Sequence, residues 1–189
     1  FEKGKHITWQ QWLILKSVER ALIGTGKKRI SIVSGHKCGK SSSMSWLMLW
    51  FLFINIDSLI AVTAPTGEQM HDVLWKEIKI WLDKMPPEVS VLYEWQSGYL
   101  RMKQRPETWF ARARTAKKES PEALAGLQGE HVLMVVDEAS GVDDMIYRSA
   151  EGSFASANTM SILISNGTRN LGYFYDSHHK DKKHWQTLQ

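Results

Sequence analysis

The sequence is poor in cysteine and lacks long hydrophobic runs. Its 189 residues include a single cysteine, Cys38, which cannot form a disulfide within the chain. Because Cys38 also lies in a loop that we interpret below as functional, we expect the protein to reside in a reducing compartment. The longest unbroken apolar run, at residues 46–54, has nine residues, whereas a membrane span needs about 20. We therefore interpret this run as a buried helix and expect no membrane partner.

The composition is that of a globular protein. Hydrophobic residues make up 43% and charged residues 23% of the chain, which excludes disordered and collagen-like classes. The net charge of +4 permits an anionic partner without proving one. We expect most of the nine tryptophans in the core. The start of the chain has neither a signal-peptide pattern nor an initiator methionine, so we expect the sequence to be a fragment.

Helices alternate with short apolar strands along the chain. Apolar spacing predicts a helix at 9–22, which ends before Gly24. A further helix, beyond the one expected at 46–54, begins near Thr66 and Gln69, which have capping-box spacing, and ends at Pro86-Pro87. One face of this helix carries Met70, Val73, Leu74, Ile78, Trp81 and Leu82. Strands are predicted at 30–33, 59–62, 109–114, 132–136 and 160–164, with a hairpin formed by 89–95 and 99–103.

The strands at 132–136 and 160–164 are apolar throughout rather than alternating. This pattern is typical of strands buried on both faces, and its alternation with helices indicates a mainly parallel sheet covered on both sides. We expect one α/β domain over 1–189, with no internal repeat and no linker. The basic residues at 180–184 are expected to be a frayed end without a closing element.

The sharpest local signal is the segment 34–41, Ser-Gly-His-Lys-Cys-Gly-Lys-Ser. It follows a predicted strand and precedes a predicted helix, which is the setting of a phosphate-binding loop. Backbone N–H groups of such a loop and the positive end of the helix bind phosphate oxygens. Lys40 would reach the β- and γ-phosphates, and the Ser41 hydroxyl would bind Mg²⁺. Because Ser34 replaces the usual first glycine, an ordinary helix start with serine caps is the alternative.

An acidic pair follows the apolar strand at 132–136. Asp137 would reach the Mg²⁺ shell, and Glu138 would activate the water that attacks the γ-phosphate. The alternative is a strand that ends in a solvated acidic turn. The loop and the acidic pair together predict a nucleotide triphosphatase. A third strand end, at 165–169, places Asn166 and Thr168 where they could sense the γ-phosphate, and a simple Asn-Gly turn is the alternative.

The set and order of these motifs resemble the large subunit of a tailed-bacteriophage terminase, a motor that packages DNA. The resemblance rests on TWQQW, SGHKCGKSS, VTAPTGEQ, VLMVVDEASGV and ISNGTRNLGYFYD, and it covers about residues 7–176. It implies a three-layer αβα P-loop NTPase of the additional-strand, catalytic-Glu type. ATP and Mg²⁺ are the implied cofactors, with Lys40 and Glu138 as catalytic residues and Ser41 and Asp137 as metal ligands.

The resemblance also assigns roles to residues. Trp9 and Gln10 match an adenine-recognition motif, with Gln11 as the alternative because the register of the two glutamines is ambiguous. Nucleotide-binding positions in the loop are Ser34, Gly35, His36, Lys37, Cys38, Gly39, Lys40, Ser41 and Ser42. A motif thought to link hydrolysis to movement comprises Ser165, Asn166, Gly167, Thr168 and Arg169.

Two departures from the family pattern matter. Many relatives carry an Arg-Gly pair before the acidic pair, proposed to act across subunits as an arginine finger. Here the sequence reads Ala125-Gly126, which leaves Arg112, Arg114 and Arg148 as candidates. The family's C-terminal nuclease domain has no counterpart before the chain ends, so nuclease activity is not expected.

Partners follow from the same resemblance. They are double-stranded DNA, the portal protein, the terminase small subunit and further copies in a ring, in the cytoplasm of a bacterial host. A basic stretch at 101–118 could contact the DNA backbone without sequence preference, and a solvated hairpin is the alternative. A helicase-like or other nucleic-acid-stimulated ATPase, or a nucleotide-binding structural module without turnover, are the competing functions.

Overall fold

The computed structural model describes residues 6–35, 38–116, 124, 128–155 and 158–189. Its centre is an eight-stranded sheet in the order β3-β4-β5-β2-β6-β7-β1-β8. From β5 to β8 in this order all neighbours pair in parallel, whereas β4 pairs antiparallel with both β3 and β5. The strands are β1 (Arg29–Val33), β2 (Leu59–Thr63), β3 (Tyr93–Gln96), β4 (Tyr99–Met102), β5 (Phe110–Ala113), β6 (Val132–Asp137), β7 (Thr159–Ser165) and β8 (Gln186–Leu188).

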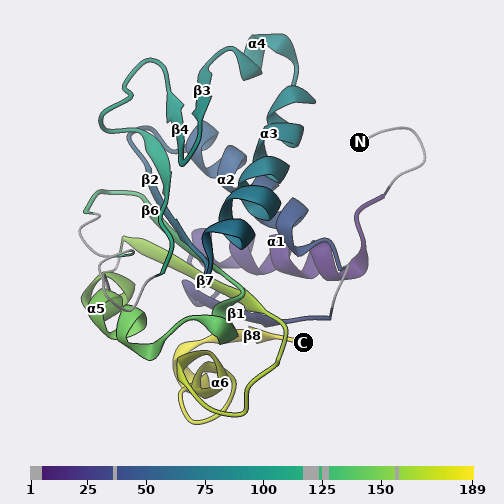
Figure 1. Cartoon of the computed structure of the whole chain (residues 1–189), viewed down its shortest axis with the longest axis vertical. Coiled ribbons are helices and arrows are strands. Elements are labelled where there is room, and N and C mark those ends of the chain that lie inside the picture. Colours follow the sequence, from purple (N-terminus) through teal and green to yellow (C-terminus); the bar gives the residue numbers. More distant parts are fainter. Residues whose placement is uncertain (1–5, 36–37, 117–123, 125–127, 156–157) are drawn as a thin grey trace.

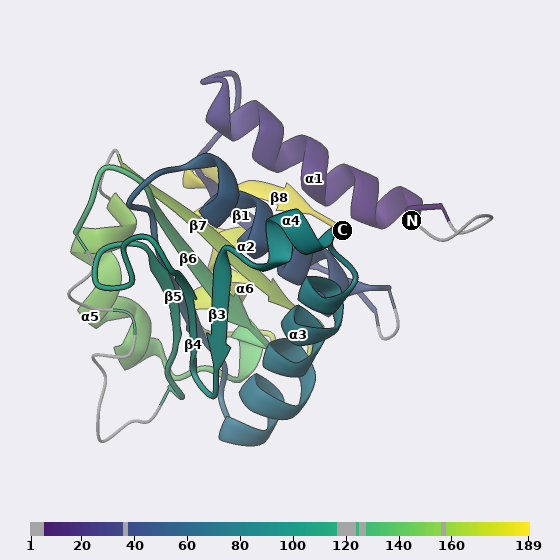
Figure 2. The same ribbon diagram turned by 90° about the horizontal axis from the view of Figure 1, so that it is seen from above.

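Helices cover both faces of the sheet (Figures 1 and 2). One layer contains α1 (Trp9–Leu22), α2 (Lys40–Ile54), a π-helical segment η1 (Gln69–Trp75) and α3 (Lys76–Asp83), followed by the short α4 (Pro87–Ser90). The other contains α5 (Asp144–Ala155) and α6 (Tyr173–His178). The short 3₁₀ turns η3 (Ala139–Gly141) and η4 (Lys182–His184) complete the elements. The predicted three-layer α/β fold is confirmed.

The strand order carries information about the site. β7 lies between the loop-bearing β1 and the acidic β6, as expected of the additional-strand type. In register, Val33 pairs with Ser165 and Asp137 pairs with Ile164. The carboxyl ends of β1, β6 and β7 therefore meet at one edge of the sheet.

The local predictions hold best for the first helix and the central strands. Helix α1 has the predicted bounds, with Thr8 and Gln11 forming a capping box and Gly24 at φ +77° just beyond its end. The predicted hairpin is present and turns through Gly98 at φ +84°. The strand expected at 89–95 is wrong in its first half, because a proline at the first helical position starts α4 there.

The helix after Thr66 departs from the predicted regular geometry. The Thr66 hydroxyl accepts from the Gln69 N–H as expected, but η1 is wound as a π-helix. The wider turn rotates Val73 away from the core, and its side chain is 50% exposed. Placing Val73 on the buried face is therefore wrong, since the expected spacing assumes 3.6 residues per turn.

The predicted frayed C-terminal end is also wrong. β8 pairs in parallel with β1 and is the outermost strand on that side of the sheet. Leu188 packs against the core. Trp185 is buried and stands edge-on to Tyr173. A closing element thus exists, although its three-residue sequence Gln-Thr-Leu carries no strand pattern of its own.

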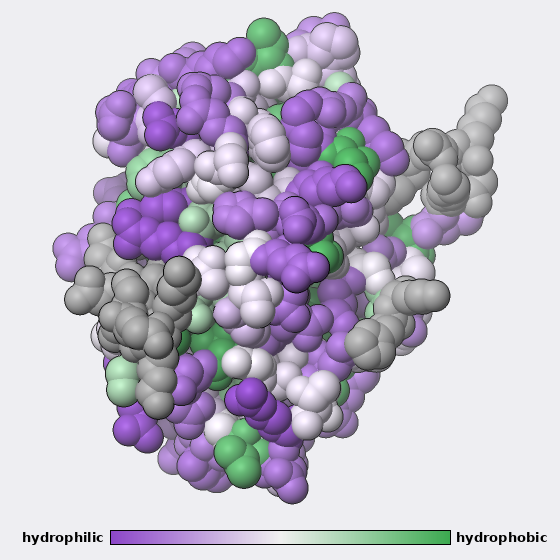
Figure 3. Space-filling view, viewed as in Figure 1, coloured by the Kyte–Doolittle hydropathy of each residue, from purple (hydrophilic) through white to green (hydrophobic). Residues whose placement is uncertain are grey.

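Fewer tryptophans are buried than the composition suggests. Three of the nine are buried: Trp75, Trp109 and Trp185. The apolar run at 46–54 belongs to α2 but is buried on one side only, and Trp50, Phe53 and Ile54 are 41–46% exposed. On the face shown in Figure 3, exposed hydrophobic residues are scattered among polar ones. No helix in the described part of the chain has the length and apolar character to cross a membrane.

Candidate active site

The loop after β1 is anchored to the end of β7. The Ser34 N–H donates to the Ser165 carbonyl at 3.1 Å. Gly39 has φ +73°, a conformation that favours glycine, and Lys40 then opens α2. The strand–loop–helix arrangement predicted from the sequence is present, while His36 and Lys37 lie outside the described residues.

Lys40 joins the loop to the third strand end. Its Nζ donates to the Gly35 carbonyl at 3.0 Å and to Asn166 Oδ1 at 2.7 Å. The second of these hydrogen bonds brings together residues 126 positions apart in the sequence. The ammonium group therefore lies between the loop and the residues predicted to sense a γ-phosphate.

The serines at the start of α2 divide into two kinds. The hydroxyls of Ser43 and Ser45 donate back to the helix carbonyls of Gly39 and Ser41, and Ser42 donates to Glu77 of α3. The hydroxyl of Ser41 makes no hydrogen bond within the described residues. The hydroxyl oxygen of Ser41 is therefore available, as a Mg²⁺ ligand would require.

Asp137 ends β6 in a nearly buried position, with 5% of its surface exposed. Burial raises the pKa of Asp137 to about 6, and the neighbouring Glu138 charge acts in the same direction. A hydrogen bond from the Glu138 N–H at 3.0 Å and the charge of Lys40 act in the opposite direction. Lys40 and Asp137 are thus close enough to interact electrostatically across the site.

Glu138 adopts a strained backbone conformation. Its φ of 47° and ψ of 44° are left-handed, which few residues other than glycine, asparagine and aspartate adopt. Such strain is concentrated at functional sites. The Ser165 hydroxyl donates to Glu138 Oε2 at 3.4 Å. The carboxylate is thereby oriented by the end of β7, beside the loop.

Ser140 is a site residue that the sequence reasoning missed. Its hydroxyl lies 2.8 Å from the hydroxyls of both Ser165 and Thr168, and its N–H donates to Ser165. A hydroxyl network therefore ties the acidic turn to the predicted coupling segment. Its position two residues after Glu138 was the available signal. Of the other coupling residues, Gly167 and Arg169 are exposed and make no contact with Lys40 or Glu138 among the interactions described.

The N-terminal helix contacts the loop through Gln11 rather than Gln10. Gln11 is 7% exposed, accepts from the Thr8 N–H at 2.9 Å and donates to the Gly39 carbonyl at 3.4 Å. Gln10 is exposed, and Trp9 is 66% exposed and stacked on Trp12. The structure thus puts Gln11 against the loop, and adenine recognition by any of these residues stays a prediction.

The three arginine-finger candidates make no side-chain hydrogen bond or ion pair to the loop among the described residues. Arg112 is partly buried on β5, where burial and then Arg114 lower its pKa, and its Nε has no hydrogen-bond partner. Arg114 and Arg148 are exposed. Residues 125 and 126, where relatives carry the Arg-Gly pair, lie outside the described residues. A role across subunits stays a prediction for all three arginines.

The oxygen groups at this edge suit a magnesium ion shared with phosphate. No cluster of three or more His, Cys, Asp or Glu side chains occurs within the described ranges, so a cation held by protein groups alone is not indicated there. Ser41 and Asp137 instead offer one hydroxyl and one carboxylate. Magnesium commonly combines such a small ligand set with substrate phosphates and water.

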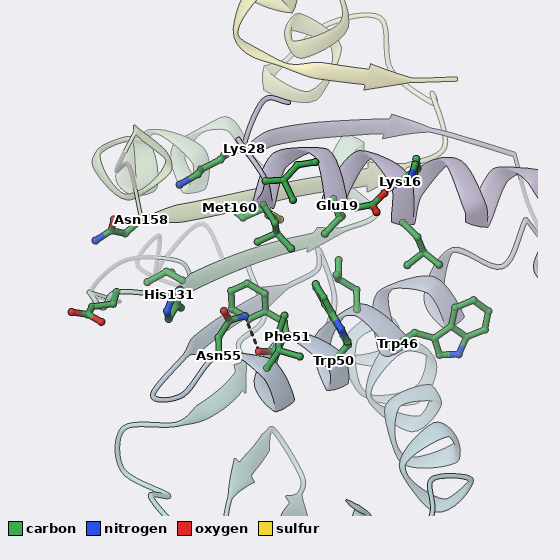
Figure 4. A pocket seen from close by; sticks show the side chains of 18 of the residues that line it. Lys16, Glu19, Lys28, Trp46, Trp50, Phe51, Asn55, His131, Asn158 and Met160 are labelled. Atoms are coloured by element: carbon green, nitrogen blue, oxygen red, sulfur yellow. Dashed lines mark hydrogen bonds and ion pairs between the residues drawn. The ribbon is translucent and has the colours of Figure 1, made fainter. Parts of the chain in front are cut away.

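A hollow lies at the amino ends of β6 and β7, on the side of the sheet opposite the loop (Figure 4). Its volume is about 1080 Å³, and apolar side chains of α1 and α2 line it together with the first residues of β6 and β7. Trp46, Trp50, Phe51 and Met160 are among these residues. None of the predicted nucleotide-binding positions lines it. The predicted nucleotide-binding loop therefore lies away from this hollow.

Comparisons with known proteins identify a relative of this chain by sequence. A probable terminase large subunit of Enterobacteria phage P7 is 31% identical to this chain over 184 residues. The match covers 94% of this chain and 35% of that protein, so the chain spans about a third of its relative. A search of protein-family descriptions finds no match.

Solved structures of terminases share the fold. The large terminase ATPase domain of Thermus phage P74-26 superimposes with a TM-score of 0.66 at 21% identity, over 92% of this chain and 68% of that one. The large terminase of a thermophilic bacteriophage, solved in complex with ADP, gives a TM-score of 0.72 at 16% identity, over 96% and 44%. This chain is therefore homologous to phage terminase large subunits over almost its whole length and has the fold of their ATPase domain.

Proposed function

We propose that this chain is an ATP hydrolase, the ATPase domain of a terminase large subunit that drives double-stranded DNA into a procapsid. The observation that carries the proposal is the convergence at one sheet edge of Lys40, the acidic pair and Asn166, linked by the 2.7 Å Lys40–Asn166 hydrogen bond. The large terminase of the thermophilic bacteriophage has been solved with ADP and with ATP-gamma-S, which supports nucleotide binding at the corresponding fold.

Each residue has a role that its position supports. Backbone N–H groups of the loop and of the first turn of α2 bind phosphate oxygens, and Lys40 neutralises their charge. Glu138, held by Ser165, orients and deprotonates the attacking water. A Mg²⁺ ion bound to Ser41 and Asp137 would polarise the β- and γ-phosphates.

Asn166 supplies a route from phosphate to the rest of the site. A γ-phosphate would compete with Asn166 Oδ1 for the Lys40 ammonium group. Release of Asn166 would then affect Thr168, whose N–H donates to the Asn166 carbonyl at 2.9 Å, and through Thr168 the hydroxyl of Ser140. This contact chain supports the coupling role proposed for residues 165–169.

One face of the outer strands offers a surface for DNA phosphates. Leu100 and Ala111 belong to the core cluster that includes residues of α2 and α3. Arg101 and Arg112 each directly follow one of them in a strand, so they point to the other face of the sheet. Neither arginine forms an ion pair within the described residues, and Arg101 stacks on Tyr99 at 4.7 Å. Arg105, in the turn after β4, is instead paired with Asp57. Arg101 and Arg112 are both partly buried, and arginines without an ion pair on one face support a sequence-independent contact to a phosphate backbone.

The remaining assignments concern the assembly. The portal protein, the small subunit and neighbouring copies of a ring are proposed partners, in the cytoplasm of the bacterial host. A neighbouring subunit would complete the site with an arginine, for which Arg112, Arg114 and Arg148 stay candidates. The relatives named above are terminases, so they lend no support to a helicase-like ATPase.

The decisive experiment measures ATP binding in the presence of Mg²⁺ by calorimetry. The wild-type chain should bind, and Lys40→Ala should bind at least about tenfold more weakly because it removes the cation that faces the phosphates. Lys183→Ala, at an exposed position in η4, is the matched control and should bind like the wild type. Normal binding by Lys40→Ala would refute the assignment of the loop.

A further inference from the structure

A carboxylate of the neighbouring helix contacts the start of α2. Ser42, in the first turn of α2, donates its hydroxyl hydrogen to Glu77 Oε1 at 2.5 Å. The same oxygen accepts the indole N–H of Trp81 at 2.8 Å. Helices α2 and α3 lie side by side in both ribbon views (Figures 1 and 2). Glu77 is partly buried and forms no ion pair within the described residues.

The contact repeats one turn further along both helices. Trp46 lies four residues after Ser42, and Trp81 lies four residues after Glu77. The two indole rings meet edge-to-face, with centroids 4.9 Å apart and planes at 87°. Residues four apart occupy the same side of a helix, so the two pairs form a short ladder that fixes α3 along α2. This ladder begins at the turn that carries Lys40 and Ser41.

The charge of Glu77 also suits its place. A helix N-terminus carries a partial positive charge, which a nearby carboxylate stabilises. The Ser42 hydroxyl donates to this carboxylate, whereas Ser43 and Ser45 donate to carbonyls of their own helix. Ser42 is thus the serine at the start of α2 that ties this turn to another element.

We propose that Glu77 is a positioning residue for the phosphate site, acting through Ser42 on the turn that presents Lys40 and Ser41. This inference rests on the proposed nucleotide-binding function. It assigns to Ser42 a structural contact with α3 in place of a direct contact with phosphate. Small displacements of such a turn weaken binding because ligating groups must be held within about half an ångström.

The test combines four variants with a binding assay for ATP and Mg²⁺. Glu77→Ala and Ser42→Ala should each weaken ATP affinity roughly tenfold and raise the Mg²⁺ concentration needed for half-maximal binding. The double variant should be no weaker than Glu77→Ala, since both changes break one contact. Glu77→Gln keeps an acceptor oxygen for both donors and should restore most of the lost affinity. Glu88→Ala, an exposed carboxylate on α4, is the matched control.

The outcomes separate this inference from the function on which it rests. Wild-type binding together with unchanged binding by Glu77→Ala would overturn the positioning role alone, even if the melting temperature falls. Additive losses in the double variant would also overturn it, because Ser42 would then act on phosphate directly. Failure of the wild type to bind ATP would instead refute the proposed function. If Glu77→Ala does not fold, Glu77→Asp takes its place, because its shorter side chain withdraws the carboxylate from Ser42. Glu77→Asp should then weaken ATP binding while Glu77→Gln binds almost normally, and normal affinity in Glu77→Asp would overturn the proposal.

Discussion

The carboxyl and amino edges of the central sheet differ in the kinds of side chain that they bring together. At the carboxyl edge, three strand ends bring together a lysine, two carboxylates and a hydroxyl network, with strained backbone at Glu138. At the amino edge, the same strands begin beside a hollow of about 1080 Å³ whose walls are mainly apolar. In this parallel sheet the charged and hydroxyl side chains of the candidate site therefore lie at the carboxyl ends of the strands, which face helix N-termini. Cavity volume by itself does not identify the reactive edge.

The largest effect is expected at the carboxyl edge, from Glu138→Gln. Loss of the general base should lower the steady-state ATP hydrolysis rate by about 10²- to 10⁴-fold, while ATP binding is retained because the amide keeps the shape of the side chain. Hydrolysis should be measured by phosphate release and binding by calorimetry on the same sample. Glu130→Gln, an exposed glutamate at the amino edge, is the control. Equal rates for Glu138→Gln and the wild type would remove the assigned role.

Two glycines with nearly the same φ angle sharpen the comparison. Gly39 (φ +73°) lies at the carboxyl edge, and Gly24 (φ +77°) follows α1 near the amino edge. A Cβ at Gly24 has no neighbour within 4 Å, whereas one at Gly39 would lie 2.3 Å from Gln11 Nε2, which Thr8 helps to hold. Gly24→Ala should cost only the backbone strain, about 1–2 kcal/mol of unfolding free energy, with normal ATP affinity.

Gly39→Ala should cost more than Gly24→Ala in a denaturant titration and should also weaken ATP binding at least about tenfold, since the added methyl displaces Gln11 or the loop. The double variant Gln11→Ala/Gly39→Ala separates the two causes. It should recover part of the stability because the clash is gone, although the backbone strain remains. Equal losses for Gly24→Ala and Gly39→Ala would show that the loop conformation has no special requirement.

The positions of the loop and the acidic pair at the carboxyl edge could be predicted because these motifs are local. The loop follows a β-branched strand, and the acidic pair follows an apolar strand. In a parallel sheet the carboxyl ends of both strands lie on the same side, so the two motifs come together. Non-local contacts escaped prediction for the same reason. Ser140 and Glu77 are single polar residues whose partners lie 25 and 35 positions away. β8 forms because the outer side of β1 offers backbone groups with which it can pair. The segment η1 is a π-helix where the apolar spacing predicted a regular α-helix.

The region beneath β1 should show a smaller, pH-dependent effect. His178 of α6 is 8% exposed and bonded to the Ser31 hydroxyl at 2.9 Å, and burial lowers its pKa, followed by the charges of His179 and Lys182. At a pH between the folded and unfolded pKa values, the His178 imidazole is protonated in the unfolded chain but neutral in the folded protein. The stability contribution is present above about pH 6.5 and is lost as the pH falls below that value.

Melting curves between pH 7.5 and 5.5 test this expectation. His178→Gln should flatten the fall in Tm on acidification by a few degrees, whereas His184→Gln, at an exposed position in η4, should leave the slope almost unchanged. The same slope in His178→Gln as in the wild type would mean that other groups cause the acid sensitivity.

The smallest effect is expected from the amino edge, and it tests the comparison most directly. Trp50 lines the hollow, is 41% exposed and lies on α2, the helix whose other end carries Lys40. Trp50→Gln should lower the melting temperature slightly because some apolar contact is lost. ATP affinity should stay within about twofold of the wild type, since distant sites without shared partners act independently. A large loss of ATP binding would show that α2 transmits changes from one edge to the other, and the two edges would then have to be treated as one coupled unit.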